Sequence, residues 1–241
     1  MTVLLLSSSL IAGVIRTTLG VGAGIFLTAC LGLVFEPRFV LAVTAILQLA
    51  FDVSAGYHFW GAWDRELVAV MGSATVAGVV SGSYLLAVLP ALWVRRTMGA
   101  LLCAYAVSQF PGARRGTTMS LGTGAAAAAA IGFLSGAASA LANVSGVILA
   151  VHLLALGLSH SRYMGSLTAI QFVQDIAKLV TYTSFGVLGV DAVWAALPMV
   201  PCVLVGGGLG VLVNRWIPPA LFRAMVLGVV TVSGLRLLLQ H

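Results

Sequence analysis

Long apolar segments separated by short polar ones follow one another along the whole chain. Charged residues, proline and glycine separate them, and each segment approaches or exceeds the ~20 residues that a helix needs to cross the hydrocarbon core of a bilayer. The pattern predicts an all-α polytopic membrane protein with about eight transmembrane helices. The segments are residues 3–35, a second ending near 60, 67–89, 97–110, 121–158, 163–185, 192–213 and 220–239.

Two of these segments are too long for one straight crossing, and each contains an interruption. Residues 20–24 read Gly-Val-Gly-Ala-Gly, and residues 143–146 read Asn-Val-Ser-Gly. We expect a long or broken helix at each place. Helix N-termini at Gly22, Gly24, Asn143 and Ser145 would expose N–H groups to an anion. Close helix packing through small residues is the alternative interpretation.

The second half of the chain repeats the order of the first. Gly24 aligns with Gly146, Thr44 with Thr168, Asp64 with Asp191, and Gly78 with Gly206. We therefore expect a first transmembrane repeat at residues 1–110, a linker at 111–120 and a second repeat at 121–241. Four spans per half would make the repeats parallel, whereas re-entrant first segments would make them inverted.

Loop charges favour the parallel arrangement. With eight spans, one set of alternate loops holds six Lys or Arg residues and the other holds three. The richer set, which includes both Arg38 and Arg162, is expected in the cytoplasm. We expect the chain to be an integral membrane protein of a bacterial inner membrane.

Composition excludes most other classes of protein. Of the 241 residues, 61% are hydrophobic and 7% are charged, too few charges to cover a soluble or nucleic-acid-binding domain. The sequence holds no GxSxG, HExxH or P-loop motif, and its three cysteines are isolated. We expect no enzyme activity, cofactor, metal or nucleic-acid partner. The expected partners are a small substrate and lipid, and a homo-oligomer stays open.

The sixth apolar segment carries one polar stripe. Residues three or four apart share a helix face, which groups Gln171, Gln174, Asp175 and Lys178. Lys178 is the only lysine, and a charge at membrane depth costs about 2.5–3.5 kcal/mol on insertion scales. The stripe suggests an anion-binding lysine modulated by Asp175. The alternative is an ion pair that only locks the helices together.

The second segment carries a matching stripe of Thr44, Gln48 and Asp52. An aspartate inside the membrane is a candidate proton carrier, so Asp52 and Asp175 are candidates for proton coupling. Arg16 either reaches the membrane surface or faces the same pocket. His58 fits an aromatic belt at the interface and His152 a structural role.

The order of these motifs resembles the sulfite exporter TauE/SafE family of membrane permeases. The likeness rests on Gly20–Gly24, on Thr44 in an alanine-rich segment, and on Tyr57, Gly61, Asp64, Gly78, Gly82, Pro90, Arg95 and Arg96. It departs from the family at Ala23 in the glycine run, at Thr28 where proline is common, and at residues 143–146.

The resemblance implies a duplicated four-plus-four helical transporter of sulfite, an organosulfonate or a related sulfur oxyanion. We expect the substrate to bind at Gly22, Gly24, Thr44, Gln48, Asn143, Ser145, Thr168, Gln171 and Lys178. Two alternatives remain open: a membrane scaffold that transports nothing, and a cation carrier that uses Asp52 and Asp175.

Overall fold

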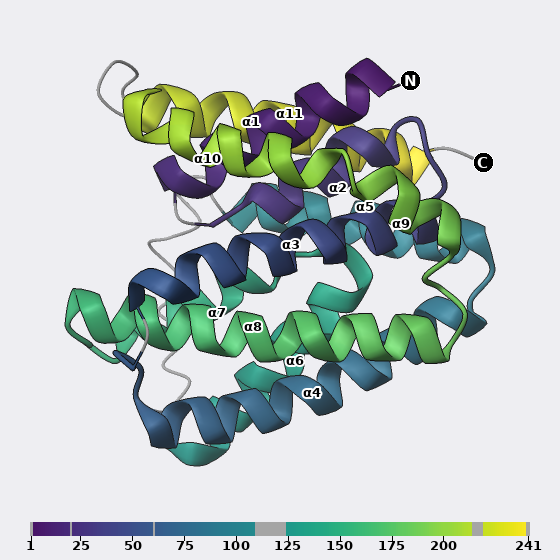
Figure 1. The fold of residues 1–241 in the computed structure, drawn as a ribbon. Helices are drawn as coiled ribbons and strands as arrows, with labels where there is room; N and C mark the ends of the chain where they lie inside the picture. Colours follow the sequence, from purple (N-terminus) through teal and green to yellow (C-terminus); the bar gives the residue numbers. More distant parts are fainter. Residues whose placement is uncertain (1, 20, 60, 109–123, 214–218, 240–241) are drawn as a thin grey trace.

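In the computed structural model, every regular element among the described residues, 2–19, 21–59, 61–108, 124–213 and 219–239, is an α-helix (Figure 1). The first half contains α1 (Thr2–Leu19), α2 (Ala23–Gly32), α3 (Pro37–Phe59), α4 (Arg65–Val88) and α5 (Ala91–Ser108). The second half contains α6 (Ala125–Ala142), α7 (Ser145–Ala155), α8 (His160–Ser184), α9 (Val190–Ala196), α10 (Met199–Val213) and α11 (Pro219–Leu239). The expected linker, residues 111–120, lies outside the described residues.

Both expected interruptions are present. Gly22 precedes α2 with φ of 100°, a left-handed conformation that glycine adopts without strain. Asn143 ends α6 with φ of 57°, and it is the one non-glycine residue with positive φ in the described chain. Asparagine tolerates this conformation better than most residues. The two breaks therefore follow from local sequence.

The segment α6–α7 is a helical hairpin. Gly132 packs on Met71, Gly136 on Thr75 and Gly82 on Ala137, so α6 runs parallel to α4. The connection before α4 also contacts the start of α8, because the Asp64 N–H donates to Ser166 Oγ at 3.0 Å. We call this side of the bundle the Asp64 end. Since α6 runs away from it and α8 begins at it, α7 must return to it.

The segment α1–α2 is a second hairpin, which enters from the opposite side. Leu10 packs on Gly206 and Val14 on Gly210, so α1 runs parallel to α10. α10 follows from the end where α8 finishes and α3 starts, which we call the Arg38 end. α2 returns to that end to join α3. Figure 1 shows α1 running away from the N-terminus and α2 turning back beside it.

These helix directions disagree with the parallel arrangement that the loop charges favour. Arg38 lies at one end of the bundle, where it donates to the carbonyls of Leu86, Ala87 and Leu89 at the end of α4. Arg162 lies in the first turn of α8, at the Asp64 end. Charge counting put both residues on one side because it treated each broken segment as one crossing. The expected count of eight spans is not confirmed.

Glycines join several helix pairs, and two of these contacts occupy equivalent positions in the two halves. A Cβ on Gly78 would overlap the Phe133 carbonyl of α6, and a Cβ on Gly206 would overlap the Leu10 carbonyl of α1. Backbones this close gain dispersion contacts that need no hydrophobic driving force, which suits packing inside a lipid phase. The α4–α6 and α1–α10 contacts thus match each other, as Gly78 and Gly206 do in the sequence alignment.

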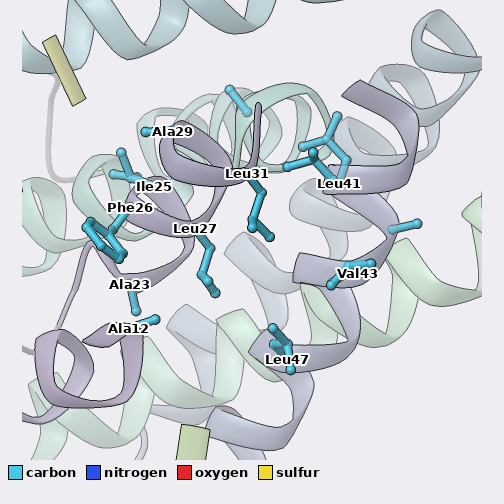
Figure 2. Packing of buried hydrophobic residues seen from close by; sticks show 14 of the residues in the cluster. Ala12, Ala23, Ile25, Phe26, Leu27, Ala29, Leu31, Leu41, Val43 and Leu47 are labelled. Atoms are coloured by element: carbon cyan, nitrogen blue, oxygen red, sulfur yellow. The ribbon is translucent and has the colours of Figure 1, made fainter. Parts of the chain in front are cut away.

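The hydrophobic core surrounds α2. Figure 2 shows side chains of α1, α2 and α3 packed together, with Leu27 and Leu31 of α2 between Ala12 and Leu41. A helix that is apolar and buried on nearly all sides needs cover from other helices. By length and composition, four helical stretches of the described chain can cross a membrane: Pro37–Ser54, Arg65–Val88, Ala125–Ala142 and Val190–Gly210.

Candidate functional site

A polar cluster occupies the interior between the tips of the two hairpins and the middle of α3 and α8. Lys178 of α8 lies at its centre with no exposed surface. Its Nζ donates to Gln48 Oε1 at 2.6 Å and to Asn143 Oδ1 at 3.0 Å, and lies 2.7 Å from Asp175 Oδ1. The ammonium group is therefore held by three oxygens from three different segments. We call this cluster, with the residues bonded to it below, the polar centre.

Asn143 connects the two hairpins. Its Nδ2 donates to Thr28 Oγ1 of α2 at 2.9 Å and to Thr44 Oγ1 of α3 at 2.8 Å. Its Oδ1 accepts from Lys178. The left-handed backbone at this position turns the side chain of the α6–α7 tip toward the other hairpin. All three side-chain hydrogen bonds of Asn143 depend on that turn.

Gln174 fixes the same tip from α8. Its Nε2 donates to Ser139 Oγ at 2.7 Å and to Ser145 Oγ at 2.8 Å. Ser139 belongs to the last turn of α6 before the break, and Ser145 is the first residue of α7 after it. A Cβ on Gly146 would lie 3.1 Å from Gln171 Nε2, and a Cβ on Gly24 would overlap the Gln48 amide. Glycine at these positions lets the hairpin backbones approach the amide side chains.

The starts of α2 and α7 both lie at these tips. Gly22 precedes α2 and Val144 precedes α7, and neither helix has a side-chain N-cap. The first N–H groups of a helix lack partners within the helix, and they carry partial positive charge. Two uncapped helix starts thus lie beside the buried ammonium group of Lys178.

Arg16 brings a second cation to the polar centre from α1. Its Nη2 donates to Asp52 Oδ1 at 2.8 Å and to Gln171 Oε1 at 3.3 Å. Asp52 lies one turn after Gln48 on α3, and Asp175 lies three residues before Lys178 on α8. Since Lys178 bonds Gln48 and the two helices run antiparallel, the two aspartates face each other. The order of charged groups is Arg16, Asp52, Asp175 and Lys178. Arg16 faces the cluster, which is one of the two interpretations that the sequence left open.

The structure brings together most of the residues that the stripes predict. Lys178, Gln48, Asn143 and Thr44 form one hydrogen-bonded network, Gln171 joins it through Arg16, and Ser145 is joined to the stripe through Gln174. Gly22 and Gly24 lie at the tip of the first hairpin. Thr168 is buried on α8, but no hydrogen bond within the described chain links it to this network. The side chain of His58 lies outside the described residues.

Two residues of the network were not expected as site residues. Thr28 accepts from Asn143, and Ser139 accepts from Gln174. Thr28 stands at a position where the sequence departs from the resembled family. That departure was the one feature of the sequence that could have indicated a role for Thr28 in the site. Ser139 lies in a run of small residues typical of helix packing, and nothing local distinguishes it.

Three buried oxygens near the polar centre accept no hydrogen bond within the described chain. They are Asp52 Oδ2, Asp175 Oδ1 and Gln174 Oε1. Asp175 Oδ1 is within ion-pair distance of Lys178, although it lacks hydrogen-bond geometry. Buried polar atoms without partners are uncommon, and they mark places where a proton, water or ligand completes the structure.

Comparison with known proteins gives one match. The sequence model of the family described as "Sulfite exporter TauE/SafE" matches residues 5–237, nearly the whole chain. No curated protein and no solved structure matches. That family consists of membrane transporters rather than enzymes, which agrees with the apolar helices found here. The chain therefore belongs to the TauE/SafE sulfite exporter family.

Proposed function

We propose that this protein is a secondary carrier that moves a small sulfur oxyanion, sulfite or an organosulfonate, across a bacterial inner membrane by alternating access. The single observation that carries the proposal is Lys178. A fully buried ammonium group lies where two hairpin tips meet two long helices, and its partners are neutral amides and one carboxylate. Charged residues inside membrane segments mark ion and substrate paths more often than structural contacts.

The polar centre offers the donors that a sulfonate or sulfite group needs. Such an anion presents several oxygen acceptors around sulfur. Lys178 Nζ, the amide group of Gln48 and the uncapped starts of α2 and α7 supply donors. The amide group of Asn143 supplies one more when it releases Thr28 or Thr44. In this proposal the anion takes the place of Gln48 Oε1 and Asn143 Oδ1 at the ammonium group. Gln171, Ser145 and Thr168 stay proposed contacts at the edge of the site.

We also propose that the two halves are inverted repeats. Each begins with a hairpin, α1–α2 or α6–α7. Three crossings follow in each half: α3, α4 and α5 in the first, and α8, α9 with α10, and α11 in the second. Hairpins that enter from opposite sides and meet near the middle suit binding at the interface of two repeats. Because Lys178 has no exposed surface, this conformation is an occluded one, and movement of a hairpin opens it to one side at a time.

A cation carrier is the second candidate, because the three unpartnered oxygens are all acceptors. A cation bound between Asp52 and Asp175 would satisfy them. Against this, each carboxylate already pairs with its own cation, Asp52 with Arg16 and Asp175 with Lys178. The charge available for a further cation is therefore small, and we prefer the anion.

Transport by the purified protein in proteoliposomes tests this proposal. Vesicles loaded with unlabelled methanesulfonate or sulfite should take up the labelled anion by counterflow. Lys178→Gln should abolish it, whereas Arg65→Gln, an exposed charge at the start of α4, should not. Anion counterflow that persists in Lys178→Gln, or counterflow of a monovalent cation in its place, contradicts the proposal.

A further inference from the structure

Four charged side chains form one row of alternating sign through the interior. Arg16 of α1 pairs with Asp52 of α3, and Lys178 of α8 pairs with Asp175 on the same helix. Asp52 and Asp175 are the two inner members, and they face each other between α3 and α8, one turn from the bond that joins Gln48 to Lys178. Both aspartates are 2% exposed and Lys178 is fully buried, while the Arg16 side chain keeps 17% of its surface. One side of the row is therefore nearer to solvent than the other.

The inner carboxyl groups can take up one proton between them. Two ionised carboxylates repel each other and cannot hydrogen-bond, because both are acceptors. Asp52 Oδ2 accepts no hydrogen bond in the described structure, and Asp175 Oδ1 has only the ion-pair contact with Lys178. A single proton on one of the two carboxyl groups supplies the missing donor, and the pair then titrates as a unit.

No other ionisable group in the described interior competes for this proton. Tyr182 of α8 donates its hydroxyl to the Ala140 carbonyl at 2.6 Å. His152 lies two turns along α7 from the hairpin tip, with Leu149 and Leu153 of the same helix in a separate apolar cluster. Gln48 and Gln171, which bond to the two cations, are neutral. Among the described residues, the charged groups that face the two carboxyl groups are Arg16 and Lys178, and the hydroxyl group of Tyr182 also lies near Asp175.

We propose that Asp52 and Asp175 take up one proton between them when the anion binds, and that the charge balance of this row couples one proton to one monovalent anion moving in the same direction. This inference rests on the proposed function and specifies its coupling. It also makes Arg16 a substrate-facing residue, because a proton on Asp52 weakens its ion pair and leaves the guanidinium group to face the anion.

Electroneutrality gives the physical reason for this stoichiometry. Without proton and anion, two cations and two carboxylates balance. With both bound, the proton adds one positive charge and the anion one negative charge, so the row is neutral again. With either one alone, the buried row carries a net charge, which a low-dielectric interior disfavours. The neutral states are the ones that can change access, so the two ligands move together.

The test uses methanesulfonate, because the anion of a strong acid has no neutral form that leaks through lipid. Proteoliposomes carry an imposed pH gradient, and a potassium gradient with valinomycin sets the membrane potential separately. An acidic exterior should drive accumulation, and a tenfold proton gradient should support about tenfold accumulation by linkage. The membrane potential should leave this accumulation unchanged. Accumulation that follows the potential, or that scales as the square of the proton gradient, overturns the inference.

Variants then assign the proton to the pair. In Asp52→Asn and in Asp175→Asn, accumulation driven by the pH gradient should be lost, measured relative to the anion counterflow that the same vesicles show at equal pH. Glu66→Gln, an exposed carboxylate of α4, should keep both. Full gradient-driven accumulation in either asparagine variant overturns the shared proton. The wild-type stoichiometry stands as evidence even where a variant fails to fold.

The two proposals fail in different ways. If wild-type vesicles show counterflow of neither methanesulfonate nor sulfite, the proposed function itself is contradicted. Wild-type counterflow with no response to the pH gradient contradicts the coupling alone and leaves the anion carrier in place.

Discussion

At the scale of single residues, Asn143 carries the largest number of separate requirements. Its backbone takes the left-handed conformation that ends α6, and its side chain bonds Thr28, Thr44 and Lys178. One residue thus shapes the hairpin tip and joins it to both α2 and α3. Few residue types meet both demands, since the conformation favours glycine or asparagine and the hydrogen bonds need an amide.

Asn143→Gly separates these two demands. Glycine keeps the left-handed turn but removes all three side-chain hydrogen bonds. We expect a stability loss of about 1–3 kcal/mol, the cost of leaving a buried partner unsatisfied, and at least tenfold slower counterflow. Denaturant titration in detergent and vesicle uptake measure the two effects. Unchanged transport in this variant would remove Asn143 from the binding site.

Lys178 and Asp175 form an ion pair, so the effects of replacing them singly and together should not be additive. Lys178→Ala leaves a buried carboxylate without its cation, which costs about 3–5 kcal/mol. The double variant Lys178→Ala, Asp175→Ala removes both charges and should recover most of that loss without recovering transport. A thermal unfolding series of the two single variants and the double variant gives the coupling. Equal destabilisation in Lys178→Ala and in the double variant contradicts the pairing.

The side-chain spacing in the sequence predicts much of the polar centre. Residues three or four apart place Lys178 with Asp175, and Gln48 with Thr44, whatever surrounds the helices. Spacing on one helix cannot show that Arg16 reaches Asp52, because that contact depends on how α1 packs across α3. Ser139 was missed for the same reason, since only the position of Gln174 on another helix gives it a polar role.

At the scale of elements, matching glycine contacts join α4 to α6 and α1 to α10. The two pairs use equivalent positions in the two halves, Gly78 and Gly206. The interruptions at Gly22 and Asn143 could be predicted because local conformation causes them. The reversal of chain direction at these interruptions could not be predicted, because a break in an apolar segment is equally compatible with a kinked helix that crosses once. The parallel packing of α6 on α4 is what decides it.

The glycine contacts predict matched effects in the two halves. Gly78→Ala and Gly206→Ala each put a Cβ into a neighbouring backbone carbonyl, so the helices must separate. We expect each to destabilise the protein by about 1–3 kcal/mol, the range for overpacking. Gly208→Ala is the control, since a Cβ there meets no atom within 4 Å. Thermal unfolding should rank Gly208→Ala close to wild type, and equal stability of all three would contradict this packing.

At the scale of the whole molecule, the two hairpins determine the topology. The start of α1 and the end of α2 share the Arg38 end, although a straight first segment would put them on opposite faces of the membrane. The hydrophobic content of the sequence predicts the membrane environment, and the family match agrees with it. The number of crossings could not be predicted, because residues 3–35 are long enough either to cross once or to turn back.

Labelling of single cysteines tests this topology. In a chain whose Cys30, Cys103 and Cys202 are replaced by alanine, Val3→Cys and Val34→Cys should react with an impermeant maleimide from the same side. Glu66→Cys, at the start of α4, should react from the other side. All three positions are exposed at the bundle surface. Opposite labelling of Val3→Cys and Val34→Cys contradicts the hairpin and restores a single crossing.

The most direct test of the central claim is equilibrium binding of labelled sulfite to the purified protein in detergent. The account predicts saturable binding of one anion per chain that methanesulfonate competes for. It predicts that Lys178→Gln loses this binding while Arg65→Gln keeps it. Saturable binding that is unchanged in Lys178→Gln would contradict a polar centre built around the buried lysine.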